Sequence, residues 1–340
     1  MNSWSAGLAV AGLILAVPTL ALADEATPDA SPSNTSALAA AIAPLAAASD
    51  SGAATEKPCG LPKWLGLPAR DADPFDDFAR PVTNIQFHHP FVRSEARFLF
   101  VHHWFPDTSV VDGGWLRAYA LQINAKLTDE LVFTAYKDGF VELEADGLPD
   151  GSGFADIAIG LKYKAWEDVE SSSIFSVGLG YELTWPGDEE VLEGEGDGFA
   201  DLYGSYATKF GDVNFIGTAG IMLPKDSDED VRTAHWHMHV DFPTSDGTFA
   251  PLLEVNAFHY LDDAERNAGF GPTVPLKAEA FDYTTLGSGG VDGHTAMTIG
   301  AGFRWSISDD ITFGAAYEVP LGGRTDLLDR RLTMDLVFRF

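Results

Sequence analysis

The sequence predicts an all-β protein, a closed antiparallel β-barrel of about twelve strands that crosses a membrane, with a disordered N-terminal arm. Three observations support this prediction. Apolar and polar residues alternate with a period of two along many segments after about Asn84. The connections between these segments are alternately short and long. After the N-terminal leader, no stretch approaches the roughly 18 to 20 apolar residues of a membrane helix.

The composition suits strands and turns and excludes one class of partner. Of the 340 residues, 46% are hydrophobic, 12% are aromatic and 34 are glycine. The formal net charge of −30 opposes binding to nucleic acid, whose phosphates favour clustered Lys and Arg. The single cysteine, Cys59, excludes an intrachain disulfide.

Residues 1–23 have the pattern of a cleavable signal peptide. An apolar core spans Ala6 to Ala16, and Ala21-Leu22-Ala23 is a small-x-small cleavage site before Asp24. The sequence therefore predicts export to the periplasm.

Two further segments precede the barrel. Residues 24–57 are rich in Ala, Ser, Pro and Thr and are interpreted as a low-complexity linker. Residues 58–83 combine five prolines with apolar side chains such as Trp64 and Phe78. We interpret them as a periplasmic arm or a plug-like segment, and the transmembrane barrel as residues 84–340.

The candidate strands follow one another from the first aromatic-rich segment to the C-terminus. In the clearest of them, Phe175 and Val177 fall on one face, and Ser176 and Glu182 fall on the other. The twelve candidates are Glu95–Phe105, Trp115–Leu127, Leu131–Lys137, Phe154–Trp166, Ile174–Trp185, Phe199–Phe210, Val213–Leu223, Ala234–Phe242, Phe249–Leu261, Ala296–Ile307, Ile311–Leu321 and Arg331–Phe340.

The lengths of the connections keep one phase through the chain. The short ones are residues 128–130, 167–172, 211–212, 243–248 and 308–310. The long ones are residues 107–114, 138–153, 186–197, 225–233, 262–295 and 322–330. Short periplasmic turns alternating with long outer loops are typical of outer-membrane barrels.

The last ten residues carry a resemblance to a known class. Leu332, Met334 and Phe338 share a face with the terminal Phe340. This strand resembles the last strand of bacterial outer-membrane β-barrels. The resemblance implies recognition of the Phe340 strand by the barrel-assembly machinery, contact with outer-membrane lipid, and localisation in the bacterial outer membrane.

The polar face of the strands predicts a narrow, charged lumen. Eight strands leave an interior filled by side chains and sixteen or more leave a water channel, so twelve falls between. The predicted lumen-lining residues are Asp156, Lys162, Lys164, Glu182, Asp201, Glu254, Arg304, Glu318, Asp335 and Arg339.

A row of histidines is the sharpest candidate for binding chemistry. His235, His237, His239 and Asp241 share one strand face, where neighbouring imidazoles lie roughly 6.5 to 7 Å apart and can share a divalent metal. The alternative is a polar lumen wall that faces carboxylates such as Glu254. No other cofactor is predicted. The adjacent pairs His88-His89 and His102-His103 are interpreted as rim residues.

A repeated motif carries a second resemblance. Gly153-Phe154-Ala155-Asp156 and Gly198-Phe199-Ala200-Asp201 each open a strand after a long loop, and Pro186-Gly187-Asp188 follows another strand. With Lys162-Tyr163, these motifs resemble the outer-membrane transporter family named for the meta (MetA) pathway of phenol degradation. The resemblance implies a barrel that passes or senses small, often hydrophobic or aromatic compounds.

The predicted function is passive passage of small solutes, including hydrophobic or aromatic ones, through the charged lumen. The alternative is a non-conducting barrel that binds a metal, ligand or partner through the lumen histidines or the acidic outer loops, residues 188–197 and 226–230. Catalysis is not predicted, because the sequence has no Gly-x-Ser-x-Gly elbow.

Overall fold

The computed structural model describes residues 73–194, 196–267 and 276–340. The predicted signal peptide, the linker, the first part of segment 58–83 and Glu195 of the acidic loop lie outside the described residues. No helix in the described part of the chain is both long and apolar enough to cross a membrane.

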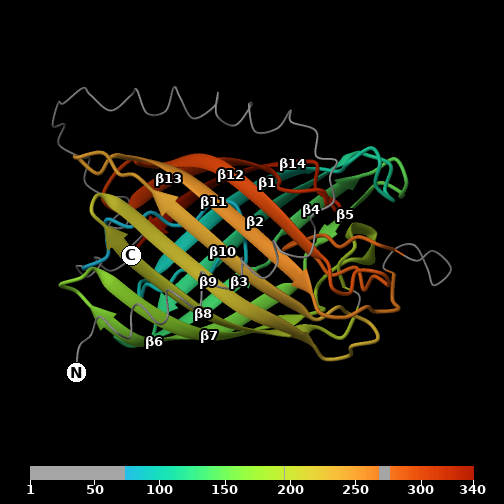
Figure 1. Ribbon diagram of the computed structural model, residues 1–340, viewed down its shortest axis with the longest axis horizontal. Helices are drawn as coiled ribbons and strands as arrows, with labels where there is room; N and C mark the ends of the chain where they lie inside the picture. The colour runs from blue at the N-terminus through green and yellow to red at the C-terminus, as the bar shows by residue number, and fades with distance from the viewer. Residues whose placement is uncertain (1–72, 195, 268–275) are drawn as a thin grey trace.

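Antiparallel strands form one continuous sheet (Figure 1). They are β1 (Glu95–Trp104), β2 (Trp115–Lys126), β3 (Leu131–Lys137), β4 (Phe140–Glu144), β5 (Gly151–Phe154), β6 (Ile157–Asp168), β7 (Ser173–Leu183), β8 (Phe199–Phe210), β9 (Val213–Pro224), β10 (Thr233–Asp241), β11 (Phe249–Tyr260), β12 (Thr295–Ser306), β13 (Ile311–Pro320) and β14 (Arg330–Arg339). A short 3-10 helix, η2 (Glu189–Val191), lies in the β7–β8 loop.

The sheet closes on itself, because β1 pairs with both β2 and β14. Ala96, for example, is opposite Phe338 of β14 and Ile123 of β2. Among the described strands, β5 alone has a strand neighbour on one side only, which is β4. The other strands are paired on both sides, which is the condition for strands to lie in lipid. The prediction of a closed antiparallel barrel is confirmed.

Two positions in the wall are each occupied by two consecutive strands with a bend between them, β3 with β4 and β5 with β6. On one side, β3 and β4 both pair with β2. On the other side, β3 pairs with β6 and β4 pairs with β5. Strands β3 and β4 together therefore occupy one position in the wall, and β5 and β6 together occupy the next. The interruptions fall at 138–139 and 155–156. Counted this way, the wall has twelve strands, as predicted.

The bend between β3 and β4 has a local cause. Gly139 has a φ of 127°, and a Cβ there would lie 2.5 Å from the carbonyl oxygen of Tyr119, so only glycine fits. The Asp138 carboxylate accepts the free Leu121 N–H at 2.8 Å. The prediction of a single loop over residues 138–153 is wrong, because the bend breaks the period of two that reveals a strand.

The two faces of the wall differ as the alternation requires. Leu161, Leu179 and Trp305 point outward and are 49%, 52% and 51% exposed, whereas Lys162 and Ser176 on the opposite parity are buried. An exposed belt of large apolar side chains is costly in water and matches the hydrocarbon of a bilayer.

The two ends of the barrel also differ (Figure 1). The long connections gather at one end, here called the loop end, and the C-terminus lies at the other, the turn end. Loops and the adjoining parts of β2 and β4 form an apolar cluster at the loop end, here called the cap, which comprises Phe105, Val111, Leu116, Val141, Leu143, Ala145, Ala155, Val191, Leu192, Leu276, Ala280, Leu286 and Leu327.

Candidate functional site

The interior of the barrel is occupied by residues 73–94, here called the inner segment. Near the turn end, Asn214 and Arg339 contact the backbone or side chains of Asp76 and Asp77. Further along, the Ile85 N–H reaches Asp282 of a long outer loop at 2.9 Å. The segment then returns to the turn end, where β1 begins. It therefore forms a hairpin-like plug within the wall.

Glu254 of β11 is the main anchor for the middle of the inner segment. Its two carboxylate oxygens accept the backbone N–H groups of Val82 and Thr83 at 2.8 and 2.7 Å. The Thr83 hydroxyl donates to the same carboxylate at 2.5 Å. On its other side, Glu254 lies 2.7 Å from Nδ1 of His239. These contacts join the segment to two neighbouring wall strands.

Two arginines donate hydrogen bonds to backbone carbonyls of residues 80–82 in the inner segment. Arg304 donates to the Arg80 and Pro81 carbonyls at 2.7 and 3.0 Å, and Arg97 donates to the Val82 carbonyl at 2.6 Å. Both guanidinium groups also pair with the Asp335 carboxylate, with Arg97 Nε at 2.5 Å. The two buried guanidinium groups therefore share one buried carboxylate.

Wall hydroxyl and amino groups hold the part of the segment that returns. Lys162 donates to the His89 carbonyl at 2.7 Å, and Ser205 and Thr218 each donate to the His88 carbonyl at 2.5 Å. The Ser205 hydroxyl therefore binds a backbone carbonyl of the inner segment. The polar side chains on the inner face of the wall thus supply hydrogen-bond donors to the backbone carbonyls of the inner segment.

The histidine row forms part of this wall. His235 lies 2.9 Å from Asp201 and 3.0 Å from His237, and His237 lies 3.0 Å from Asn256. His239 lies 3.0 Å from Asp241, besides its contact with Glu254.

These contacts engage the ring nitrogens that a metal would need. Across the described residues, one group brings three metal-ligand atoms together, and it contains no histidine. Metal binding by the row stays a prediction.

The remaining predicted lumen residues occupy different positions. Nine of the ten are buried, namely Asp156, Lys162, Glu182, Asp201, Glu254, Arg304, Glu318, Asp335 and Arg339. Asp156 lies in the bend between β5 and β6, and the other eight lie on the inner parity of their strands. Lys164 is only partly buried and pairs with Glu167 at 2.7 Å near the β6–β7 turn. Glu318 pairs with Arg331, and Arg339 pairs with Asp76 at 3.1 Å.

Several interior residues were missed or misplaced by the sequence analysis. His88 and His89 are buried inside the barrel rather than at the rim, since they precede β1 and obey no strand parity. His88 shares Asp201 with His235, at 3.2 Å. Arg97 and Arg331 follow the period of two and could have been found from it.

Little space remains around the middle of the inner segment, whereas at the turn end a cavity of about 290 Å³ lies between residues 76–80 and wall residues such as Arg304 and Arg339. One cavity of about 40 Å³ is lined by Ile85, Tyr136 and Asp282 among others, and another of about 20 Å³ by His88, Lys162 and Tyr203 among others. Each holds at most a few waters. The inner segment therefore fills the lumen at the level of these two cavities.

An aromatic cluster secures the turn-end part of the inner segment. The Phe91 ring centroid lies 6.0 Å from that of Phe75 and 5.3 Å from that of Phe78. We expect Phe91→Ala to destabilise the docked segment by about 3–5 kcal/mol. Faster tryptic cleavage after Arg93, which is followed by Ser94 and lies over the Phe91 ring at 4.5 Å, would show this in the folded barrel. Phe210→Ala, at an exposed site near the same end, should leave cleavage unchanged, and equal cleavage in both variants would contradict the prediction.

A buried carboxyl makes the outer loops sensitive to pH. Burial raises the pKa of Glu279 to about 7, although the Leu286 and Ser288 N–H groups partly oppose the shift. The folded state then binds a proton more tightly than the unfolded state. The contribution of Glu279 to the free energy of unfolding is therefore fully present below about pH 4.5. About 3 kcal/mol of it is lost as the pH rises from 4.5 through 7.

Hydrogen exchange in segment 276–290 should accordingly be faster at about pH 8 than at about pH 5, after correction for the intrinsic rate. Glu279→Gln should remove most of this difference. The same pH dependence in the variant would show that another group is responsible.

A known outer-membrane structure shares this architecture. The crystal structure of the COG4313 outer membrane channel from Pseudomonas putida F1 matches with a TM-score of 0.53 and 13% identity, over 76% of this chain and 100% of that one. The NanC porin matches with a TM-score of 0.44 and 10% identity, over 73% and 100%. The translocator domain of the autotransporter NalP from Neisseria meningitidis matches with a TM-score of 0.40 and 12% identity, over 75% and 91%.

The first of these likenesses places the fold among outer-membrane β-barrels. No family model and no curated protein matches the sequence. The resemblance to the phenol-degradation family therefore stays a prediction.

Proposed function

We propose that the chain is a gated outer-membrane channel for small solutes, and that the inner segment is its gate. The observation that carries the proposal is the chemistry of the docking surface. Between Arg80 and Pro90 the wall holds the segment chiefly through hydrogen bonds to its backbone. Such contacts exchange with water at a modest net cost, so the segment can leave without unfolding the wall.

Departure of the inner segment would uncover a polar lumen. The groups released include Glu254, Arg304 and Lys162, which are now buried against it. A channel lined by charged and hydroxyl groups is wetted and conducts small ions. The net charge of −30 favours cations at its mouths.

The cap indicates which solutes would pass. A solute arriving from the loop end first meets an interior made of Leu116, Val141, Leu276 and Leu286. A compound with an aromatic or aliphatic part can replace these side-chain contacts, whereas a strongly hydrated one cannot. Small hydrophobic or aromatic compounds are therefore the proposed cargo.

The proposed location is the bacterial outer membrane. The belt of exposed apolar side chains supports contact with lipid, and the strand ending at Phe340 supports recognition by the barrel-assembly machinery. Both proposals assume that residues 1–23 act as the predicted signal peptide.

Planar-bilayer recording of the refolded chain tests the gate. We expect a closed baseline with brief, cation-selective steps. Growth or dye-uptake assays in cells that express the chain should show faster entry of a small apolar probe. A chain that is correctly folded yet never opens, and speeds no uptake, would contradict the proposal.

A non-conducting barrel is the second candidate, and the filled interior favours it. In that case the cap would bind an apolar ligand that never crosses the lumen. Saturable quenching of tryptophan fluorescence by the probe, without uptake or conductance, would identify this function.

A further inference from the structure

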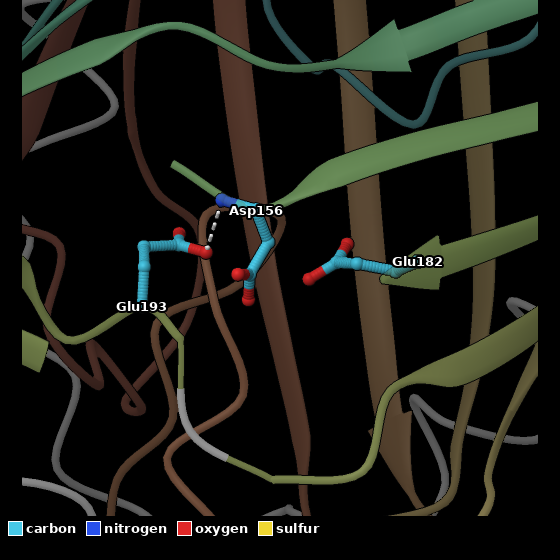
Figure 2. Close-up of side chains that lie close together, drawn as sticks. All are labelled: Asp156, Glu182 and Glu193. Carbon is cyan, nitrogen blue, oxygen red and sulfur yellow. Dashed lines mark hydrogen bonds between the residues drawn. The ribbon is translucent and has the colours of Figure 1, made fainter. Parts of the chain in front are cut away.

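Three carboxylates converge beneath the cap. Asp156 lies in the bend between β5 and β6, Glu182 lies near the end of β7, and Glu193 lies in the β7–β8 loop. One oxygen atom from each lies within 4.8 Å of the other two. Figure 2 shows the carboxylates of Glu182 and Glu193 approaching that of Asp156 from opposite sides. All three side chains are buried.

The cluster carries more negative charge than its partner neutralises. Lys137 Nζ donates to Glu182 Oε1 at 2.7 Å and to Glu193 Oε2 at 2.9 Å. Within the described residues, the ion pairs of the three carboxylates involve this lysine alone. One cation against three anions leaves two charges uncompensated, which is costly in a buried site.

Two oxygen atoms of the cluster also lack a hydrogen-bond partner. They are Glu182 Oε2 and Glu193 Oε1, and the two side chains are 5% and 0% exposed. Buried carboxylate oxygens nearly always have a partner. The site thus favours an added positive charge.

We propose that Asp156, Glu182 and Glu193 bind one Ca²⁺ ion. The ligands are all carboxylate oxygens, the donors that hard divalent cations prefer over softer metals. Two oxygens bound to one Ca²⁺ at ~2.4 Å lie at most ~4.8 Å apart, which the observed spacing satisfies. Mg²⁺ needs a tighter octahedron at ~2.1 Å. A charge of +2 neutralises the surplus left by Lys137.

The ion would fasten the cap to the wall. Two of its ligands belong to the barrel and the third to the β7–β8 loop, whose Val191 and Leu192 carbonyls accept bonds from Tyr283 and Thr284 at 2.9 and 3.0 Å. Loss of the ion would release this loop and, through it, the loop that carries Tyr283. The inference does not depend on whether the barrel conducts.

Calorimetric titration of CaCl₂ into the refolded chain, stripped with EDTA at about pH 8, tests the site. We expect one Ca²⁺ per barrel with an affinity on the order of 10⁻⁴ to 10⁻³ M or tighter. Glu193→Gln keeps the shape of the side chain and should weaken binding at least ~10-fold. Glu190→Gln removes an exposed carboxylate from the same loop and should leave it unchanged.

Heat-modifiable gel migration verifies that each variant is folded, and Glu182→Gln replaces Glu193→Gln if the latter fails to fold. Calcium should also slow proteolysis of the β7–β8 loop in the native chain but not in the glutamine variant. The proposal is overturned if the folded native chain shows no saturable uptake up to about 10 mM. It is overturned equally if Glu193→Gln binds like the native chain, or if Glu190→Gln loses as much affinity.

Discussion

Replacing Glu254 with alanine should raise the open probability of the barrel about 10- to 100-fold. The substitution removes the acceptor for the Val82 and Thr83 N–H groups and for the Thr83 hydroxyl. Hydrogen bonds to a charged group are worth about 1.5–3 kcal/mol each, and loss of the equivalent of one is enough for this change. Single-channel recording in planar bilayers measures the open probability directly.

The control for this prediction is Glu170→Ala, which removes an exposed carboxylate in the β6–β7 turn. It should leave the open probability at the native value. Glu254→Gln keeps part of the acceptor and should fall between. If folded Glu254→Ala stays as closed as the native chain, the inner segment is not the gate, or it is held elsewhere more strongly than its contacts imply.

Asp335→Ala should be the most destabilising single substitution in the interior, at about 3–5 kcal/mol. Its carboxylate is buried between Arg97 and Arg304 and pairs with both. Removing it leaves two guanidinium groups in the interior without their shared anion. The expected result is a lower urea midpoint for unfolding in detergent and a lower temperature for the heat-modifiable gel shift.

Asp212→Asn, in the exposed turn between β8 and β9, serves as the matched control and should change stability by less than about 0.5 kcal/mol. Asp335→Asn should cost less than Asp335→Ala, because the amide oxygen still accepts from one arginine. An unchanged urea midpoint for Asp335→Ala would mean that water or another acid replaces the carboxylate.

The alternation of apolar and polar residues with a period of two predicted most of the fold. It assigned the outward row of β7, the inner row of β10 and the closing strand β14, because a strand must turn alternate side chains to opposite faces. The same rule placed Asp201, Glu254 and Asp335 on the inner face. It failed at residues 138–156, where Gly139 and Asp156 mark bends and two wall strands shift their phase.

The alternation says nothing about what lies against the inner face. Residues 73–94 have no period, and their docking depends on contacts over more than 100 positions, such as Thr83 with Glu254 and Ser205 with His88. For the same reason the histidine row could be assigned to a face but its ring nitrogens could not be assigned to partners. Asp201 and Asn256 reach those nitrogens from neighbouring strands.

By itself, the sequence determined that this chain forms a closed barrel with an apolar exterior and a charged interior, since strand parity and connection length are local properties. Only the tertiary structure decided that the interior is filled by the chain's own residues, and that Asp156, Glu182 and Glu193 meet beneath the cap. Both outcomes depend on the packing of segments distant in sequence, which no local pattern records.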